Sequence, residues 1–175
     1  MKLFYRKSGN GKPLLILHGL FGISDNWATL AKRWAEKYTV YAVDLRNHGQ
    51  SPHDDTWNYT VMSEDLVELI RREGLEKIIL IGHSMGGKTA MRLALDHPEL
   101  VSHLIVSDIA PRASTYTQRD VVTALEAVQP THLASRKDAE TILDQHITDN
   151  GTKQFLLKNL YWKDVNNTKV LDWRF

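Results

Sequence analysis

The sequence predicts an α/β protein with a mostly parallel, twisted β-sheet that is covered by helices on both faces. Two features of the 175-residue chain lead to this prediction. Up to about residue 108, short aliphatic or β-branched runs alternate with helical patterns, which is the order typical of parallel sheets. Beyond that point the strand patterns stop, and helical stretches follow one another. The chain is long enough to bury one substantial core.

The expected elements of the sheet region follow from apolar runs and helical spacing. The run 13–17 is apolar on both faces, as in a central strand, whereas 3–6 is typical of an edge strand. Helices are predicted where apolar side chains recur three and four residues apart, and Gly74 and Pro98 end two of them. The expected strands are 3–6, 13–17, 39–43, 77–81 and 101–107, and the expected helices are 25–37, Thr60 as N-cap through 72, and 85–96.

The last third of the chain is predicted to be an all-helical insertion without strands. Its clearest helical stretches are 117–128 and 136–147, and a shorter one covers 153–160. The predicted division is an N-terminal core over 1–111, the helical insertion over 112–169, and the start of a return to the core over 170–175.

Composition excludes several classes of function. The 22 basic and 21 acidic residues give a net charge of +1, so there is no electrostatic reason to expect a nucleic acid or an anionic membrane as partner. The absence of cysteine removes disulfides, thiolate metal sites and cysteine nucleophiles. No apolar run approaches the roughly 18 residues of a membrane span, and the first residues do not resemble a signal peptide. We therefore expect a cytoplasmic protein.

The segment Gly-His-Ser-Met-Gly at 82–86 is the strongest chemical motif. It matches G-x-S-x-G, lies between an apolar strand and a helix, and is typical of a sharp turn that exposes a nucleophilic serine. Such a turn predicts a strained backbone at Ser84, with small neighbours relieving the crowding. The N-terminus of the following helix favours a developing oxyanion. The alternative is an ordinary Gly-rich turn that binds nothing or a phosphate.

A second motif, His-Gly-Leu-Phe-Gly at 18–22, directly follows the central strand. Where a serine turn is present, the loop after this strand supplies one backbone N–H to the oxyanion, and the residue after the serine supplies the other. The two predicted donors are the N–H groups of Leu20 and Met85. A His-Gly loop by itself is common in proteins. It indicates an oxyanion-binding loop only because the serine turn at Ser84 is present in the same sequence.

These two motifs, together with Asp-Leu-Arg-Asn-His-Gly-Gln-Ser at 44–51, resemble the α/β-hydrolase superfamily in order and spacing. The run Val-Ser-Asp-Ile-Ala-Pro at 106–111 is similar to the bacterial esterase and acyl-CoA esterase branch, which has a helical cap and a mitochondrial relative in animals. The resemblance covers essentially the whole chain. It implies an α/β-hydrolase fold, with 112–169 as the cap, and Asp108 as the acid of a catalytic triad.

Asp108 is also plausible from its position, because it ends a strand beside the serine turn. Its alternative is a turn or N-cap aspartate before Pro111. Asp44 also ends a strand, but a structural role is expected for its loop, with Arg46 and Asn47 bonding neighbouring loops. His83 is expected to point away from Ser84 and to pack. The remaining histidines are expected to lie in solvated loops, at element ends, or on the surface of the insertion: His48, His53, His97, His103, His132 and His146.

No histidine follows a further core strand after Asp108, although the triad order in this fold is nucleophile, acid, histidine. By resemblance, two more strand–helix units should follow, together on the order of 60 residues or more, and the second of their connecting loops should carry the base. We therefore expect the C-terminal part of the core to be missing, and a companion C-terminal segment of the same polypeptide to supply it. That segment would also cover the strand 101–107, which would otherwise be an edge.

The predicted function of the complete protein is hydrolysis of small-molecule carboxylic esters or acyl thioesters through an acyl-serine intermediate, with no metal or organic cofactor. Phe21, Tyr116 and Tyr161 are candidates to line an acyl pocket. Two alternatives stay open. Within the fold, the same parts serve C–C hydrolases, lactonases, cofactor-free peroxidases and menaquinone-pathway lyases. From another class, the chain could be a non-catalytic module that binds an acyl ligand or a protein.

Overall fold

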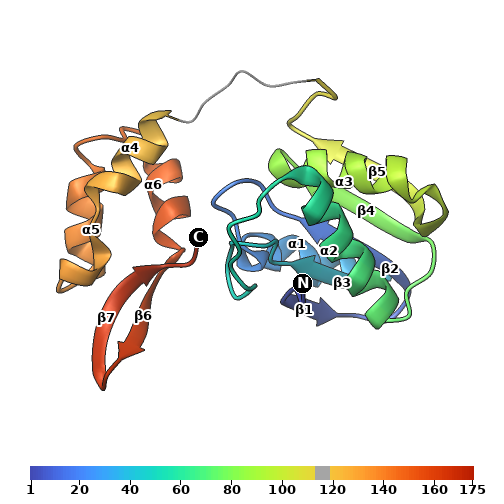
Figure 1. The fold of residues 1–175 in the computed structure, drawn as a ribbon, viewed down its shortest axis with the longest axis horizontal. Coiled ribbons are helices and arrows are strands. Elements are labelled where there is room, and N and C mark those ends of the chain that lie inside the picture. Colours follow the sequence, from blue (N-terminus) through green and yellow to red (C-terminus); the bar gives the residue numbers. More distant parts are fainter. Residues whose placement is uncertain (113–118) are drawn as a thin grey trace. The chain divides into compact units, whose positions relative to one another are not determined.

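The computed structural model describes residues 1–112 and 119–175, which form two compact units with a boundary after Arg112. The first unit holds a five-stranded sheet in the order β1-β3-β2-β4-β5 (Figure 1). Strand β1 pairs antiparallel with β3, and all other neighbours are parallel. The predicted α/β class and mostly parallel sheet are confirmed. The strands are β1 (Tyr5–Ser8), β2 (Lys12–Leu17), β3 (Tyr38–Val43), β4 (Ile78–His83) and β5 (Val101–Ser107).

Helices cover both faces of this sheet, and the two faces are unequal. Helices α2 (Tyr59–Arg72) and α3 (Met85–Asp96) pack on one face, where alternate residues of β2, β3 and β4 form the larger core cluster. The opposite face carries the short helix α1 (Ala28–Trp34), which packs on β2 and β3. Strand positions alternate between the two clusters because side chains of a strand point to opposite faces in turn.

Several predicted boundaries shift by one to three residues. Helix α2 begins after Asn58, whose side chain accepts the Val61 N–H at 3.0 Å, so the N-cap is Asn58 and not Thr60. The predicted helix 25–37 is a 3₁₀ turn, Ser24–Trp27, followed by α1. Strand β4 runs on to His83, which places Ser84 directly between a strand and a helix.

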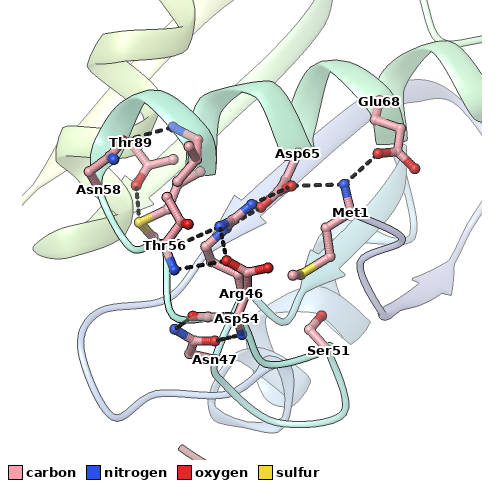
Figure 2. Close-up of polar contacts among 12 residues, drawn as sticks. Met1, Arg46, Asn47, Ser51, Asp54, Thr56, Asn58, Asp65, Glu68 and Thr89 are labelled. Atoms are coloured by element: carbon pink, nitrogen blue, oxygen red, sulfur yellow. Dashed lines mark hydrogen bonds and ion pairs between the residues drawn. The ribbon is translucent and has the colours of Figure 1, made fainter.

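The loop after β3 is tied to α2 by a buried ion pair, which Figure 2 shows. The Arg46 guanidinium donates from Nε to Asp65 Oδ2 at 2.6 Å and from Nη2 to Oδ1 at 3.0 Å, and it also contacts the Thr56 carbonyl. The amino group of Met1 lies 2.9 Å from the same carboxylate. The expectation that Arg46 bonds neighbouring segments is confirmed, and Asn47 likewise bonds the backbone of Asp54.

The second unit has a small core of its own. It contains α4 (Arg119–Ala127), α5 (Arg136–Leu143), α6 (Asn150–Leu157) and the antiparallel pair β6 (Leu160–Val165) and β7 (Thr168–Trp173). The three helices lie where helical stretches were expected, and their ends differ from the predicted ones by up to four residues. Apolar side chains from all of these elements are buried, among them Leu125, Leu143, Leu157, Leu160 and Leu171.

The β6–β7 hairpin corrects the expectation of an all-helical segment up to residue 169. Asn166 and Asn167 both adopt positive φ, 51° and 63°, as a two-residue hairpin turn of the primed type requires. Residues 170–173, expected to begin a return to the core sheet, pair with β6 instead. In the part of the chain that the structure describes, no helix combines the length and apolar character needed to cross a membrane.

Candidate active site

Ser84 occupies a one-residue turn between β4 and α3. Its backbone has φ 49° and ψ −116°, a conformation that non-glycine residues rarely adopt. The Ser84 N–H donates to the Ser107 carbonyl on β5 at 3.0 Å, and its own carbonyl accepts the Lys88 N–H at 3.1 Å. The strand and the helix thus hold this residue from both sides, and the predicted strained turn is confirmed.

Close backbone approach joins this turn to the loop that follows β2. A Cβ added at Gly86 would lie 2.5 Å from the His18 carbonyl oxygen and 2.7 Å from that of Leu17, so only glycine fits. A Cβ added at Gly19 would lie 3.3 Å from the Ser84 Cβ. The two motifs predicted from sequence therefore meet in space.

The loop 18–22 has a fixed backbone path. The Gly22 N–H donates to the Gly19 carbonyl at 2.9 Å, and Phe21 adopts φ 58°. Leu20 lies in the middle of this turn, and Met85 is the first residue of α3. The first N–H groups of a helix have no partner within it, which leaves them available to an anion.

Asp108 directly follows β5 and also has positive φ, 58°. Its side chain is 80% exposed, and Oδ2 lies 3.3 Å from Nε2 of His83. His83 pairs with Ser107 across β4 and β5, which brings its ring beside Asp108. The expectation that His83 packs holds in part: a Cβ added at Gly19 would lie 2.8 Å from its Nδ1, but the side chain is 40% exposed and contacts the predicted acid. No helix begins at 109–112, so Asp108 is not an N-cap there.

The loop histidines differ most from expectation. His48, expected to be solvated, is 2% exposed, because the loop 44–51 folds back under the loop 18–22. His18 is buried beside it, with ring centroids 5.0 Å apart. Burial lowers the pKa of His18 to about 3 and lowers that of His48 as well, since desolvation disfavours the charged imidazole. The burial of these two histidines could not be predicted from hydrophobic periodicity, because both residues lie in loops.

The Asp44 carboxylate is buried beneath the same loops and is satisfied by backbone. Oδ1 accepts the Ser24 N–H at 2.6 Å, and Oδ2 accepts the Gln50 N–H at 2.9 Å. Gly49, with φ 62°, passes so close that a Cβ would fall 2.1 Å from Oδ2. Asp44 therefore serves the structural role expected of its loop.

The three predicted pocket residues fall in different places. Phe21 belongs to the loop 18–22, Tyr161 lies on β6 beneath the Arg174 guanidinium at 4.9 Å, and Tyr116 falls outside the described residues. Across 1–112 and 119–175, no group of three or more His, Asp or Glu side chains is arranged to hold a metal ion.

A parallel sheet whose strand turns sharply at a serine into a helix, with a His-Gly loop against that turn, defines the α/β-hydrolase class. Comparison with known proteins agrees. Residues 12–135 match the family model for the alpha/beta hydrolase fold. The chain belongs to this family.

Several named relatives are esterases or lipases. The chain is 38% identical to the sn-1-specific diacylglycerol lipase ABHD11 of Xenopus tropicalis, over 97% of this chain and 54% of that protein. It is 38% identical to Esterase YbfF of Escherichia coli, over 86% of this chain and 59% of that protein. A solved marine microorganism esterase, 43% identical, superposes with a TM-score of 0.94 over 99% of this chain and 68% of the esterase. The chain thus spans little more than half the length of these curated relatives.

Proposed function

We propose that the complete protein hydrolyses carboxylic esters or acyl thioesters, with Ser84 as nucleophile. The observation that carries this proposal is the backbone of Ser84, held at φ 49° at the N-terminus of α3 and in contact with the loop 18–22. Strain of this kind persists only where the surrounding structure enforces it, and it concentrates at functional sites. Two of the named relatives, a diacylglycerol lipase and an esterase, support the same class of substrate.

In the proposed mechanism, a base takes the Ser84 proton while Oγ attacks the acyl carbon. The carbonyl oxygen becomes an oxyanion, to which Leu20 and Met85 donate their backbone N–H groups. When the tetrahedral intermediate collapses, the base returns the proton to the leaving alcohol or thiol, and the acyl group stays on Ser84. Water, activated by the same base, then attacks and releases the acid.

Asp108 is proposed to orient that base. Its carboxylate follows β5, next to the strand that carries Ser84, and it is exposed toward solvent within the first unit. A carboxylate in this position can accept the second ring N–H of a histidine and hold it in the productive tautomer. The contact with His83 leaves the other carboxylate oxygen available for this task.

A companion segment of the same polypeptide is proposed to supply the histidine. Two observations support it besides the greater length of the relatives. Strand β5 is at the edge of the sheet, and on the α1 face a groove of about 830 Å³ beside it is lined by Leu14, Trp34, Ile79, Ile81 and Ile105. Ile105 is 49% exposed there. An apolar groove next to an open strand edge suits a further strand and helix.

The remaining assignments complete the proposal. The second unit is proposed to act as a cap. Phe21 and Tyr161 each stay a candidate to contact the acyl group. The substrate is a small-molecule acyl ester or thioester, the location is the cytoplasm, and no metal or organic cofactor takes part.

The test is hydrolysis of p-nitrophenyl esters and acyl-CoA thioesters by the full-length protein and two variants. Ser84→Ala should lose on the order of 10⁶-fold in kcat, as loss of a triad serine does in subtilisin, while it stays folded. Ser8→Ala, an exposed serine on β1, is the matched control and should keep full activity. Undiminished hydrolysis by Ser84→Ala would overturn the proposal.

A further inference from the structure

Two buried imidazoles link the loop after β2 to the loop after β3 in a reciprocal way. His18, in the first loop, accepts the Leu45 N–H of the second loop on Nε2 at 3.0 Å. His48, in the second loop, accepts the Phe21 N–H of the first loop on Nε2 at 3.3 Å. Each ring therefore reaches across to the backbone of the other loop.

The opposite ring nitrogens are also bonded. His18 Nδ1 lies 2.8 Å from the Gly19 carbonyl oxygen, and His48 Nδ1 lies 2.9 Å from that of Arg46. A carbonyl can only accept, and a backbone N–H can only donate. All four contacts are satisfied only when both rings are neutral and carry their proton on Nδ1.

These bonds fix the direction of one particular peptide group. The carbonyl of Gly19 and the N–H of Leu20 belong to the same peptide, which is planar and trans, so they point in opposite directions. The Gly19 oxygen is held by two donors, His18 Nδ1–H and the Gly22 N–H. The Leu20 N–H must then point away from His18. The next N–H along the chain, that of Phe21, is held by His48.

We infer that His18 and His48 are positioning residues, which together aim the Leu20 N–H at the oxyanion formed during turnover. Neither side chain touches the substrate. The inference rests on the proposed function, since it assigns a task to the loop beside Ser84. Both rings are buried, and their centroids lie 5.0 Å apart, so the two side chains pack against each other beneath the loop.

The test compares His48→Leu with His48→Gln in the full-length protein. Leucine fills the space without an acceptor, whereas the glutamine amide oxygen can still accept the Phe21 N–H. For p-nitrophenyl ester hydrolysis, we expect His48→Leu to lose on the order of 10²-fold in kcat, with KM changed by less than about twofold, and His48→Gln to recover at least about tenfold of that loss. His53→Leu, an exposed histidine in the neighbouring segment, is the matched control and should behave as the parent.

Two results separate failure of the inference from failure of the proposed function. If Ser84→Ala is inactive and His48→Leu keeps the parent kcat, the inference is overturned and the proposed function stands. If Ser84→Ala is active, the proposed function is overturned, and the inference that rests on it is overturned as well.

A measurement on the unsubstituted protein keeps the inference testable should His48→Leu not fold. Long-range ¹H–¹⁵N correlation spectra at neutral pH report the tautomer of each ring. We expect the proton on Nδ1 for both His18 and His48. A proton on Nε2 of either ring removes the acceptor for Leu45 or Phe21 and overturns the inference.

Discussion

Ser84 has a strained backbone at the centre of the candidate active site. With φ 49° and ψ −116°, it is held by β5 on its amide side and by α3 on its carbonyl side. Such a conformation costs about 1–3 kcal/mol for a residue with a Cβ.

A glycine at this position should therefore stabilise the fold. Relief of about 1–3 kcal/mol of strain exceeds the roughly 0.5–1 kcal/mol of extra backbone entropy that glycine brings to the unfolded chain. We expect Ser84→Gly to be more stable than Ser84→Ala by about 1 kcal/mol in urea unfolding. Ser63, buried in the middle of α2, is the control, because there glycine should be less stable than alanine by about 1 kcal/mol. Equal stability of the two Ser84 variants would contradict the assignment of strain.

At this scale the sequence predicted some site residues and missed others. Ser84, its glycine neighbours and the loop 18–22 were predictable because a short motif between a strand and a helix dictates the local backbone. The burial of His48 was not, because it depends on how two loops, 27 residues apart in sequence, fold onto each other. The Arg-Asn-His-Gly run gave the only available signal, since a polar loop with its own glycine can turn back on itself.

Among the elements, a buried ion pair between Arg46 and Asp65 attaches the loop 44–58 to α2. Arg46 and Asp65 are 7% and 3% exposed, and two hydrogen bonds join them. Removing one partner of a buried ion pair lowers the free energy of unfolding strongly, whereas an exposed ion pair contributes little to it. The contrast can be measured within this chain.

We expect Asp65→Asn to lower the free energy of unfolding by about 3–5 kcal/mol, because the buried Arg46 guanidinium loses its buried carboxylate partner and keeps only the half-exposed Asp54 carboxylate at 3.7 Å. The control is Asp96→Asn, which breaks the exposed pair with Arg92 on α3, 2.5 Å between nitrogen and oxygen. This control should change stability by no more than about 0.5 kcal/mol. Denaturant unfolding of the three proteins checks both values, and a similar small effect for both variants would contradict the account.

The buried imidazoles of His18 and His48 should make the free energy of unfolding depend on pH. Both imidazoles have a pKa below the ordinary 6.5, that of His18 at about 3, so the folded state resists their protonation while the unfolded chain accepts it. Stability is then fully present above pH 6.5 and falls as the pH drops below it, by at most roughly 1.4 kcal/mol per pH unit for each ring.

This decline can be followed in denaturant unfolding between about pH 7.5 and 5, above the range in which most carboxylates titrate. His48→Gln removes one of the two rings and should give a shallower decline than the parent. A free energy of unfolding that stays constant or rises as the pH falls through this window would contradict the burial of neutral rings.

Strands and helices with a clear hydrophobic pattern were predicted well. The β6–β7 hairpin was not, for a physical reason. Strand β5 and helix α3 have the predicted bounds because apolar runs and Pro98 delimit them. The β6–β7 hairpin was missed, although Asn166 and Asn167 are a turn signal for positive φ. Its strands are half exposed, with Trp162 52% accessible, and such strands show little hydrophobic alternation.

For the whole molecule, the sheet of the first unit is asymmetric. One face is covered by α2 and α3, while beside α1 a groove lies next to the edge strand β5. The relatives extend well beyond the part that matches this chain. The proposed companion segment would fill the groove and bring a histidine to Asp108, where it could activate Ser84.

Labelling of the full-length protein with a fluorophosphonate, followed by peptide mapping, tests the central claim most directly. An activated serine reacts with this reagent, whereas an unassisted hydroxyl scarcely does. The account predicts one stoichiometric adduct, located on Ser84 and absent from Ser84→Ala. An adduct on a different residue, or ester hydrolysis that continues with Ser84 unmodified, would contradict it.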